Sequence, residues 1–276
     1  MRDLSHDKSL LAINSATVKP WNLEQLIEGC IRAGITAIAP WRDIVQAAGV
    51  EKAGGMIRSA GLTVSCYCRA GLFPAADEAG RRAALDDNRR AVDEAAAIGA
   101  RSLVLIAGGL PKGSRDLAGA HAQVHDGIAA LLPYARDNGV PLAIEPLHPM
   151  YAADRACVNT LAHATDLCEQ LGDGVGVAVD AYHVWWDPDL PAQIARAGTR
   201  ILTYHVCDWL VPTRDLLLDR GMPGDGVIDL RGMRAMVEAT GYSGPIDVEI
   251  FSAQNWWKRE PSEVLRVCLE RHQTVV

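Results

Sequence analysis

The chain has 276 residues and a mass of 29.7 kDa, which is enough for one large domain or two small ones. With 49% hydrophobic and 22% charged residues, its composition is that of a globular protein with a sizeable core. The formal net charge of -7 argues against nucleic acid or an anionic membrane as the main partner, because both favour a basic protein face.

The cysteines and the hydropathy pattern indicate a cytoplasmic protein. Seven cysteines are scattered through hydrophobic stretches without a CxxC pair, which favours reduced thiols. No apolar run approaches the roughly 18 residues of a membrane span. The first residues lack the pattern of a signal peptide, so we expect a cytoplasmic location and no membrane partner.

Short apolar runs alternate along the chain with segments whose apolar residues recur at helical spacing. Eight runs predict strands, at residues 10–14, 35–40, 62–68, 102–107, 142–146, 176–180, 201–207 and 246–251. Three helices are predicted with both ends, because a polar cap precedes the apolar stripe and a glycine follows it. These helices lie between Asn22 and Gly34, between Thr160 and Gly172, and between Asp229 and Gly241.

Eight strand–helix units in 276 residues match a (β/α)₈ TIM barrel in both count and length. A doubly wound sheet also alternates strands and helices, but it usually has fewer strands, and no GxGxxG motif follows the first predicted strand here. No low-complexity linker interrupts the sequence. We therefore expect an α/β protein in which residues 1–276 form a single TIM barrel domain.

Polar residues end the last four predicted strands, where barrels of this type carry their functional groups. They are Glu145 in LAIEPLH, Asp180 in VAVDAYH, His205 in LTYHVCD and Glu249 in DVEIFS. Three carboxylates aimed at one pocket would repel each other, and a divalent cation would remove that repulsion. Oxygen-rich ligation with one imidazole favours Mn²⁺, with Mg²⁺, Co²⁺ or Zn²⁺ as alternatives. The sequence therefore predicts one divalent metal ion bound by these four residues.

From Glu145 to Glu249 the chain carries a Glu, an Asp with a His three residues later, a His and a final Glu. In this pattern it resembles the sugar phosphate isomerase/epimerase superfamily of xylose-isomerase-like TIM barrels. That group includes ketose 3-epimerases, hydroxypyruvate isomerases, inosose isomerases and dehydratases, and endonuclease IV. The resemblance covers nearly the whole chain and implies that the same four residues bind the metal. It also implies that His183 reaches a substrate oxygen, and that Gly224 and Gly226 shape the turn into the seventh helix.

Four further side chains near predicted strand ends are candidates for binding substrate. His148 follows Glu145 by three residues, and Arg69 ends the third strand, where it could grip a hydroxyl or an anionic group. Arg214 is the nearest candidate for an arginine that ketose epimerases place after the metal-binding histidine. Trp185 could stack on the apolar face of a sugar. Barrel packing or an ordinary surface position is the alternative explanation for each of them.

The two glutamates come from different strands, so they can approach opposite faces of one substrate carbon. A cation that holds the carbonyl oxygen would stabilise an enediolate. In the epimerases that the chain resembles, one glutamate removes a proton and the other returns it. The leading hypothesis is a divalent-metal-dependent isomerase or epimerase that acts on a keto-sugar or related polyol, with Glu145, Glu249 and His183 as catalytic residues. The alternative is a lyase, either a dehydratase or a β-eliminase, acting on an oxidised sugar, 3-keto-glycoside or cyclitol.

An endonuclease on the same fold is a remote alternative. It would need further metal ligands on the early strands and a basic face for DNA. The second and third strands end in AIAPW and CYCRA, without histidine or carboxylate. We therefore expect a small-molecule carbohydrate as the binding partner and no nucleic acid, and the sequence leaves a homo-oligomer open.

Overall fold

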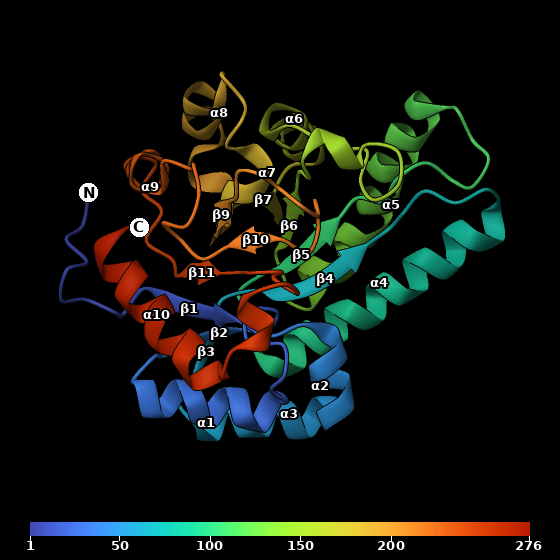
Figure 1. Ribbon diagram of the computed structural model, residues 1–276. Helices are drawn as coiled ribbons and strands as arrows, with labels where there is room; N and C mark the ends of the chain where they lie inside the picture. The colour runs from blue at the N-terminus through green and yellow to red at the C-terminus, as the bar shows by residue number, and fades with distance from the viewer.

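Nine short parallel strands form one sheet in the computed structural model, which describes residues 1–276. The strands follow the order β3-β2-β1-β11-β8-β7-β6-β5-β4, and helices surround them (Figure 1). Their bounds are Leu11–Asn14 (β1), Ala37–Ala39 (β2), Thr63–Val64 (β3), Tyr67–Gly71 (β4), Leu103–Ile106 (β5), Leu142–Glu145 (β6), Val175–Asp180 (β7), Ile201–Val206 (β8) and Ile246–Val248 (β11). A two-stranded antiparallel hairpin of β9 (Asp208–Trp209) and β10 (Arg220–Gly221) lies outside this sheet.

The predicted third strand is divided between the two ends of the sheet. Its first part, β3, pairs with β2, and its second part, β4, pairs with β5. Ser65 donates its backbone N–H to Ile38 at 2.9 Å, and Tyr67 donates to Ser102 on the other side at 2.9 Å. The segment that carries β3 and β4 thus joins the two ends of the sheet. Because β3 and β4 together fill one position, the nine strands close an eight-stranded barrel. The α/β barrel prediction is confirmed, but one continuous strand over residues 62–68 is wrong, because an apolar run does not show where the backbone changes partner.

The helices form the outer layer of the barrel. Their bounds are Leu23–Ala33 (α1), Arg42–Ala48 (α2), Val50–Ser59 (α3), Glu78–Ile98 (α4), Leu117–Asp137 (α5), Leu161–Leu171 (α6), Ala181–Val184 (α7), Leu190–Ala197 (α8), Leu230–Ala239 (α9) and Pro261–Thr274 (α10), with 3₁₀ turns at Pro149–Tyr151, Gly198–Arg200 and Trp256–Lys258. The three helices predicted with both ends are confirmed. Asn22, Thr160 and Asp229 each accept a backbone N–H from the first turn of their helix.

The strands are buried on both faces, as parallel strands under a helical layer must be. Every residue of β6 and β7 is buried, and the polar residue of each is its last one, Glu145 and Asp180. The parallel register pairs Asp180 with His205 and His205 with Asp247 across neighbouring strands. The strand ends therefore bring the candidate ligands to one end of the barrel.

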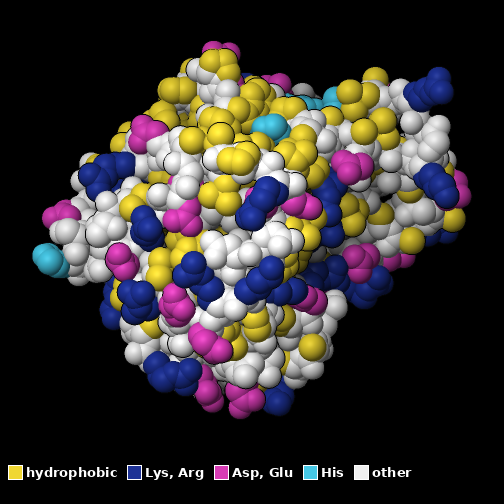
Figure 2. Space-filling model, viewed as in Figure 1, with side chains coloured by type: hydrophobic (Ala, Val, Ile, Leu, Met, Phe, Trp, Pro, Cys, Tyr) yellow, Lys and Arg dark blue, Asp and Glu magenta, His cyan; other side chains and the backbone are white.

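Side chains of different kinds occupy different parts of the surface in Figure 2. Hydrophobic side chains gather in the upper part of this face, over α7 and β9, whereas charged side chains of both signs are interspersed over the lower part. None of the helices combines the length and the apolar character that crossing a membrane would require.

Candidate metal centre and active site

The four predicted metal ligands converge at the carboxyl end of the barrel. Glu145, Asp180, His205 and Glu249 are buried, and each offers a ligand atom within 4.8 Å of the others. They come from β6, β7, β8 and the residue that directly follows β11. The arrangement of three carboxylates around one imidazole is that of a site for a divalent cation.

Two atoms at the centre of this cluster have no hydrogen-bond partner. Oε1 of Glu145 and Nδ1 of His205 are both buried, lie 3.2 Å apart and are not aligned to bond each other. Oε2 of Glu249 lies 3.9 Å from the same nitrogen. Because unpaired buried polar atoms are costly, their convergence fits a cation that all of them would bind. The residues present therefore suit a divalent metal ion.

Two of the carboxylates, those of Asp180 and Glu249, resist ionisation when no cation is bound. Burial raises the pKa of Asp180, although Arg220 opposes this shift. Burial also raises the pKa of Glu249 to about 7, with His205 opposing the rise and Glu145 adding to it. Removing charges from water costs free energy that a bound cation offsets.

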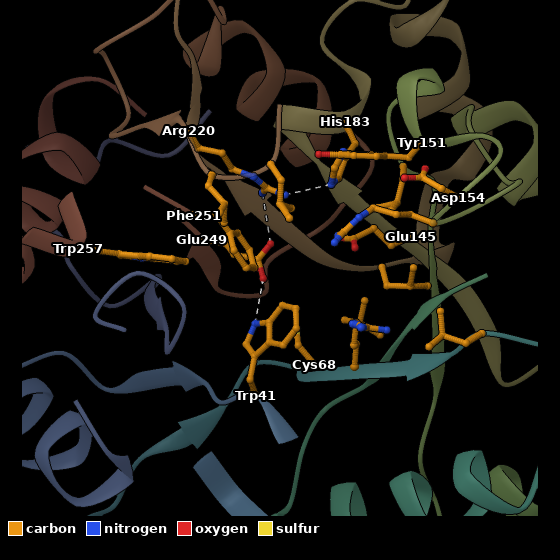
Figure 3. A pocket seen from close by; sticks show the side chains of 18 residues that line it. Trp41, Cys68, Glu145, Tyr151, Asp154, His183, Arg220, Glu249, Phe251 and Trp257 are labelled. Atoms are coloured by element: carbon orange, nitrogen blue, oxygen red, sulfur yellow. Dashed lines mark hydrogen bonds and ion pairs between the residues drawn. The ribbon is translucent and has the colours of Figure 1, made fainter. Parts of the chain in front are cut away.

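Glu249 is held in place by donors from both sides. Asn14, at the end of β1, donates to Oε1 of Glu249 at 2.9 Å, and the indole of Trp41 donates to the same oxygen at 3.2 Å. Arg220 lies 3.5 Å from the other oxygen, Oε2 (Figure 3). Sequence reasoning missed Asn14 in this role, although a polar residue that ends a buried strand was an available signal.

Arg220 is the second residue that sequence reasoning missed. Its guanidinium is buried, lies 3.2 Å from Oδ2 of Asp180, and sits over the rings of Tyr182 and Phe251 at 4.3 and 4.8 Å. It is carried by β10, in a hairpin that hydropathy did not predict. Its charge neutralises part of the carboxylate cluster.

Arg214 does not lie at this site. Its side chain is 59% exposed, and its guanidinium pairs with Asp219 through Nη2 at 2.6 Å. The prediction that Arg214 contacts substrate is therefore not supported. The buried arginine beside the ligand cluster is Arg220, six residues later, because Arg214 lies in the loop between β9 and β10 whereas Arg220 lies in β10 itself.

His183 lies beside the ligand cluster and lines the same cavity. Its Nδ1 accepts the backbone N–H of His148 at 3.1 Å, and its Nε2 lies 3.2 Å from Arg220 and 3.6 Å from Asp180. Burial and the charge of Arg220 hold the pKa of His183 well below its usual range. The ring is therefore a neutral imidazole at neutral pH, and the hydrogen bond from the His148 backbone fixes its orientation.

His148 and Trp185 do not line the cavity. The His148 ring stacks on Trp209 with centroids 5.1 Å apart and accepts the N–H of Met150. Trp185 packs on the same Trp209 ring at 5.6 Å. The structure places both rings in an aromatic cluster around Trp209 and not on the cavity wall, so it does not support their predicted contact with substrate. The backbone of His148, rather than its imidazole, serves the site by fixing His183.

A cavity of about 570 Å³ opens above the ligand cluster, a size suited to a small-molecule substrate. Glu145, His183, Arg220 and Glu249 reach its wall (Figure 3), and the predicted substrate-binding residue Arg69 also lines it. The aromatic side chains of the wall are Trp41, Tyr151, Phe251 and Trp257. The pocket wall is thus mostly apolar and aromatic, and its polar side chains include those of Glu145, His183, Arg220, Glu249 and Arg69.

The turn after the hairpin is shaped by its glycines, as expected. Asp208 accepts the backbone N–H of Gly224 at 2.8 Å and that of Ile228 at 3.0 Å. Gly224 has a φ of 89°, and a Cβ on Gly226 would collide with the backbone oxygen of Trp209. These contacts fix the hairpin that presents Arg220.

The second ring nitrogen of His205, Nε2, also has close polar neighbours. It lies 3.4 Å from Sγ of Cys66 and faces the buried carboxylate of Asp247. Sequence reasoning missed Asp247, although it lies two residues before Glu249 and so points to the same side of the strand.

Relatives of known activity match about half of the chain. An inosose isomerase from Bacillus velezensis is 28% identical over 158 residues, which are 54% of this chain and 53% of that protein. A 3-dehydroshikimate dehydratase from Pseudomonas aeruginosa is 30% identical over 149 residues, or 50% of this chain and 22% of that protein. The chain thus spans about half the length of the curated isomerases that it matches, and less of the dehydratase.

Solved structures share the fold over nearly the whole chain. Protein SMc04130 from Sinorhizobium meliloti 1021 is 60% identical, with a TM-score of 0.95 over 96% of this chain and 98% of that one. The IOLI protein with a bound zinc atom has a TM-score of 0.83 at 20% identity, covering 96% and 97% of the two chains. A D-psicose 3-epimerase crystallised in the presence of D-fructose has a TM-score of 0.77 at 17% identity, covering 96% and 98%.

The match to a family description covers most of the chain and includes all four residues of the ligand cluster. Residues 27–268 match the family described as xylose isomerase-like TIM barrel. The closed barrel with its strand-end site agrees with this match. The chain belongs to the xylose isomerase-like TIM barrel family.

Proposed function

We propose that this protein is a divalent-metal-dependent isomerase or epimerase that acts on a keto-sugar or related polyol by proton transfer. The observation that carries the proposal is the placement of Glu145 and Glu249. Both are buried, have a carboxylate oxygen 3.2 Å (Glu145) and 3.9 Å (Glu249) from Nδ1 of His205, and reach one cavity. The inosose isomerase relatives and the fold shared with a sugar epimerase support the same class of reaction.

Glu145, Asp180, His205 and Glu249 would hold the metal, with Mn²⁺ first and Mg²⁺, Co²⁺ or Zn²⁺ as alternatives. When bound, the cation would supply positive charge that lowers the cost of deprotonating the carbon beside a carbonyl. The zinc atom in the structurally similar IOLI protein supports a divalent metal.

The two glutamates have unequal surroundings, which suits different roles. The Glu145 carboxylate accepts no hydrogen bond and reaches the cavity, so the oxygen that does not bind the metal is free to take a proton from a substrate carbon. Glu249 is fixed by Asn14 and Trp41, so its position is set before substrate binds. One carboxylate removes the proton, and the other returns a proton on the opposite face.

His183 would bind a substrate oxygen. Its ring is neutral, buried and anchored by the backbone of His148, with its Nε2 edge on the side of Arg220 and Asp180. Because Nδ1 accepts a hydrogen bond, the proton of this neutral ring lies on Nε2, which can donate one hydrogen bond without bringing a charge. In this role His183 binds substrate and is not a metal ligand.

A lyase is the second candidate, and the match to 3-dehydroshikimate dehydratase favours it. The first half of the reaction would be the same, because a glutamate removes the proton beside the carbonyl. A hydroxyl on the next carbon would then leave with a proton from the site, as water. A substrate with such a leaving group turns isomerisation into dehydration.

Metal analysis and a substrate panel test the proposal. We expect about one divalent ion per chain and loss of turnover with a chelator that readdition of metal restores. Ketoses, inososes and 3-keto-sugars with added metal, followed by NMR, distinguish an isomer or epimer from a dehydrated product. Active protein that contains no metal and tolerates the chelator would contradict the proposal.

A further inference from the structure

The cavity carries two arginines that the metal centre does not use. Arg69, in β4, and Arg155, in the segment after β6, both line its wall. Neither guanidinium forms an ion pair with a carboxylate, although Asp154 lines the same cavity. Arg69 lies over the Trp41 ring at 6.0 Å, and Arg155 lies over Tyr151 at 5.4 Å. Both cations are therefore held by aromatic rings and have their hydrogen-bond donors free.

The two arginines lie close enough to repel each other. Burial, followed by the charge of Arg155, lowers the pKa of Arg69, and the charge of Glu145 opposes this shift. Neither Arg69 nor Arg155 pairs with a residue of the carboxylate cluster, whereas Arg220 lies 3.2 Å from Asp180 and 3.5 Å from Glu249. An unpaired cation pair at a partly closed site attracts an anion.

The charges of the remaining groups do not cancel this pair. A divalent cation and Arg220 together balance the three carboxylates of the ligand cluster. Asp154 is then the single carboxylate on the wall against Arg69 and Arg155; Asp154 and Arg155 are both exposed, and Arg69 is half-buried. The outer part of the metal-loaded cavity thus carries a net positive charge.

We propose that Arg69 and Arg155 form a subsite for an anionic group of the substrate, a carboxylate or a phosphate. This inference rests on the proposed function, and it narrows the substrate to a sugar acid or a sugar phosphate. Guanidinium groups bind both anions through paired N–H donors. The anionic end lies toward Arg69 and Arg155, and the polyol carbons extend toward the metal centre.

Calorimetry on the metal-loaded protein tests the subsite without turnover. The probes are D-glucitol, D-gluconate and D-glucitol 6-phosphate, which share a six-carbon chain and differ in the charged group. We expect at least one of the two anions to bind about tenfold more tightly than D-glucitol, as one charge-assisted contact would give. A preference for D-gluconate identifies a carboxylate subsite, and a preference for D-glucitol 6-phosphate identifies a phosphate subsite.

The variants R69Q and R155Q separate this subsite from direct binding of the anion to the metal. Each should reduce the affinity for the preferred anion about tenfold and leave that for D-glucitol and the metal content unchanged. R115Q is the matched control, because Arg115 is an exposed arginine after β5 that lies outside the cavity. Equal affinity for all three probes, or an anion preference that survives in both variants, would overturn the proposal.

The subsite and the proposed function can fail separately. If neutral ketoses are turned over with metal but no anion preference is found, the subsite is wrong and the proposed function stands. If the arginine-dependent preference is found but no metal-dependent turnover, the subsite stands and the proposed function is wrong.

Discussion

Oδ2 of Asp247 lies 3.7 Å from Nε2 of His205, whereas the other ring nitrogen, Nδ1, faces Glu145 and Glu249 of the ligand cluster. Both side chains are fully buried, and the register pairs the two residues directly across β8 and β11. A carboxylate on the second nitrogen of a metal-binding histidine orients the ring and raises its basicity. Under the proposed function, Asp247 would therefore position the His205 ring for metal binding.

Asp247→Asn should weaken metal binding about tenfold to a hundredfold, because the amide keeps the shape but loses the charge. Competition with a chelating dye measures this affinity. Ser102→Ala is the matched control, since it removes a buried hydroxyl without a hydrogen-bond partner away from the site. Unchanged metal affinity in Asp247→Asn would show that His205 is oriented by its packing alone.

His183→Ala should keep the metal and lose most of the turnover, because the ring lies beside the ligand set and its Nδ1 is already bonded to His148. Elemental analysis and steady-state kinetics on the same preparation give both quantities. Loss of the metal would place His183 among the ligands, and full activity would make it a structural residue of the wall.

Arg220→Met should destabilise the metal-free protein by about 3–5 kcal/mol, because the buried carboxylates of Asp180 and Glu249 lose their countercharge. The loss should be smaller in the metal-loaded protein, where the cation supplies that charge. Chemical unfolding with and without metal measures the difference. Equal destabilisation in both states would show that Arg220 acts through packing rather than charge.

His272 predicts a pH dependence of stability away from the active site. It is fully buried in α10, and its burial lowers its pKa from 6.5 to about 4. Because the folded-state pKa is the lower one, the unfolded chain binds the proton first. Stability is fully present above pH 6.5 and is lost as the pH falls toward 4, by about 3 kcal/mol in total.

His272→Met should flatten this part of the stability curve, since a neutral side chain has no proton to bind. Urea unfolding across the acid range measures it, and the exposed His6, changed to Gln, is the control that should keep the wild-type slope. Parallel curves for His272→Met and the wild type would mean that His272 binds its proton equally in the folded and unfolded states, so that burial does not lower its pKa.

The convergence of the four strand-end residues was predictable, because a carboxylate or imidazole that ends an apolar run has few structural explanations. Glu145 and Asp180 each end a fully buried strand. Arg220 was not predictable in this way, since its two-residue strand has no apolar run of its own. Likewise, Arg214 and His148 lie in irregular segments, where sequence spacing does not determine side-chain direction.

The most direct test of two-glutamate proton transfer is the exchange of substrate hydrogen with solvent. In D₂O, with metal and a substrate that is turned over, deuterium should appear at the carbon beside the carbonyl in the product. On long incubation it should also appear in recovered substrate, because a carboxylate proton exchanges with water before it returns. Glu145→Gln and Glu249→Gln should each suppress this incorporation. Turnover without any deuterium at that carbon would indicate a direct hydride shift and contradict the account.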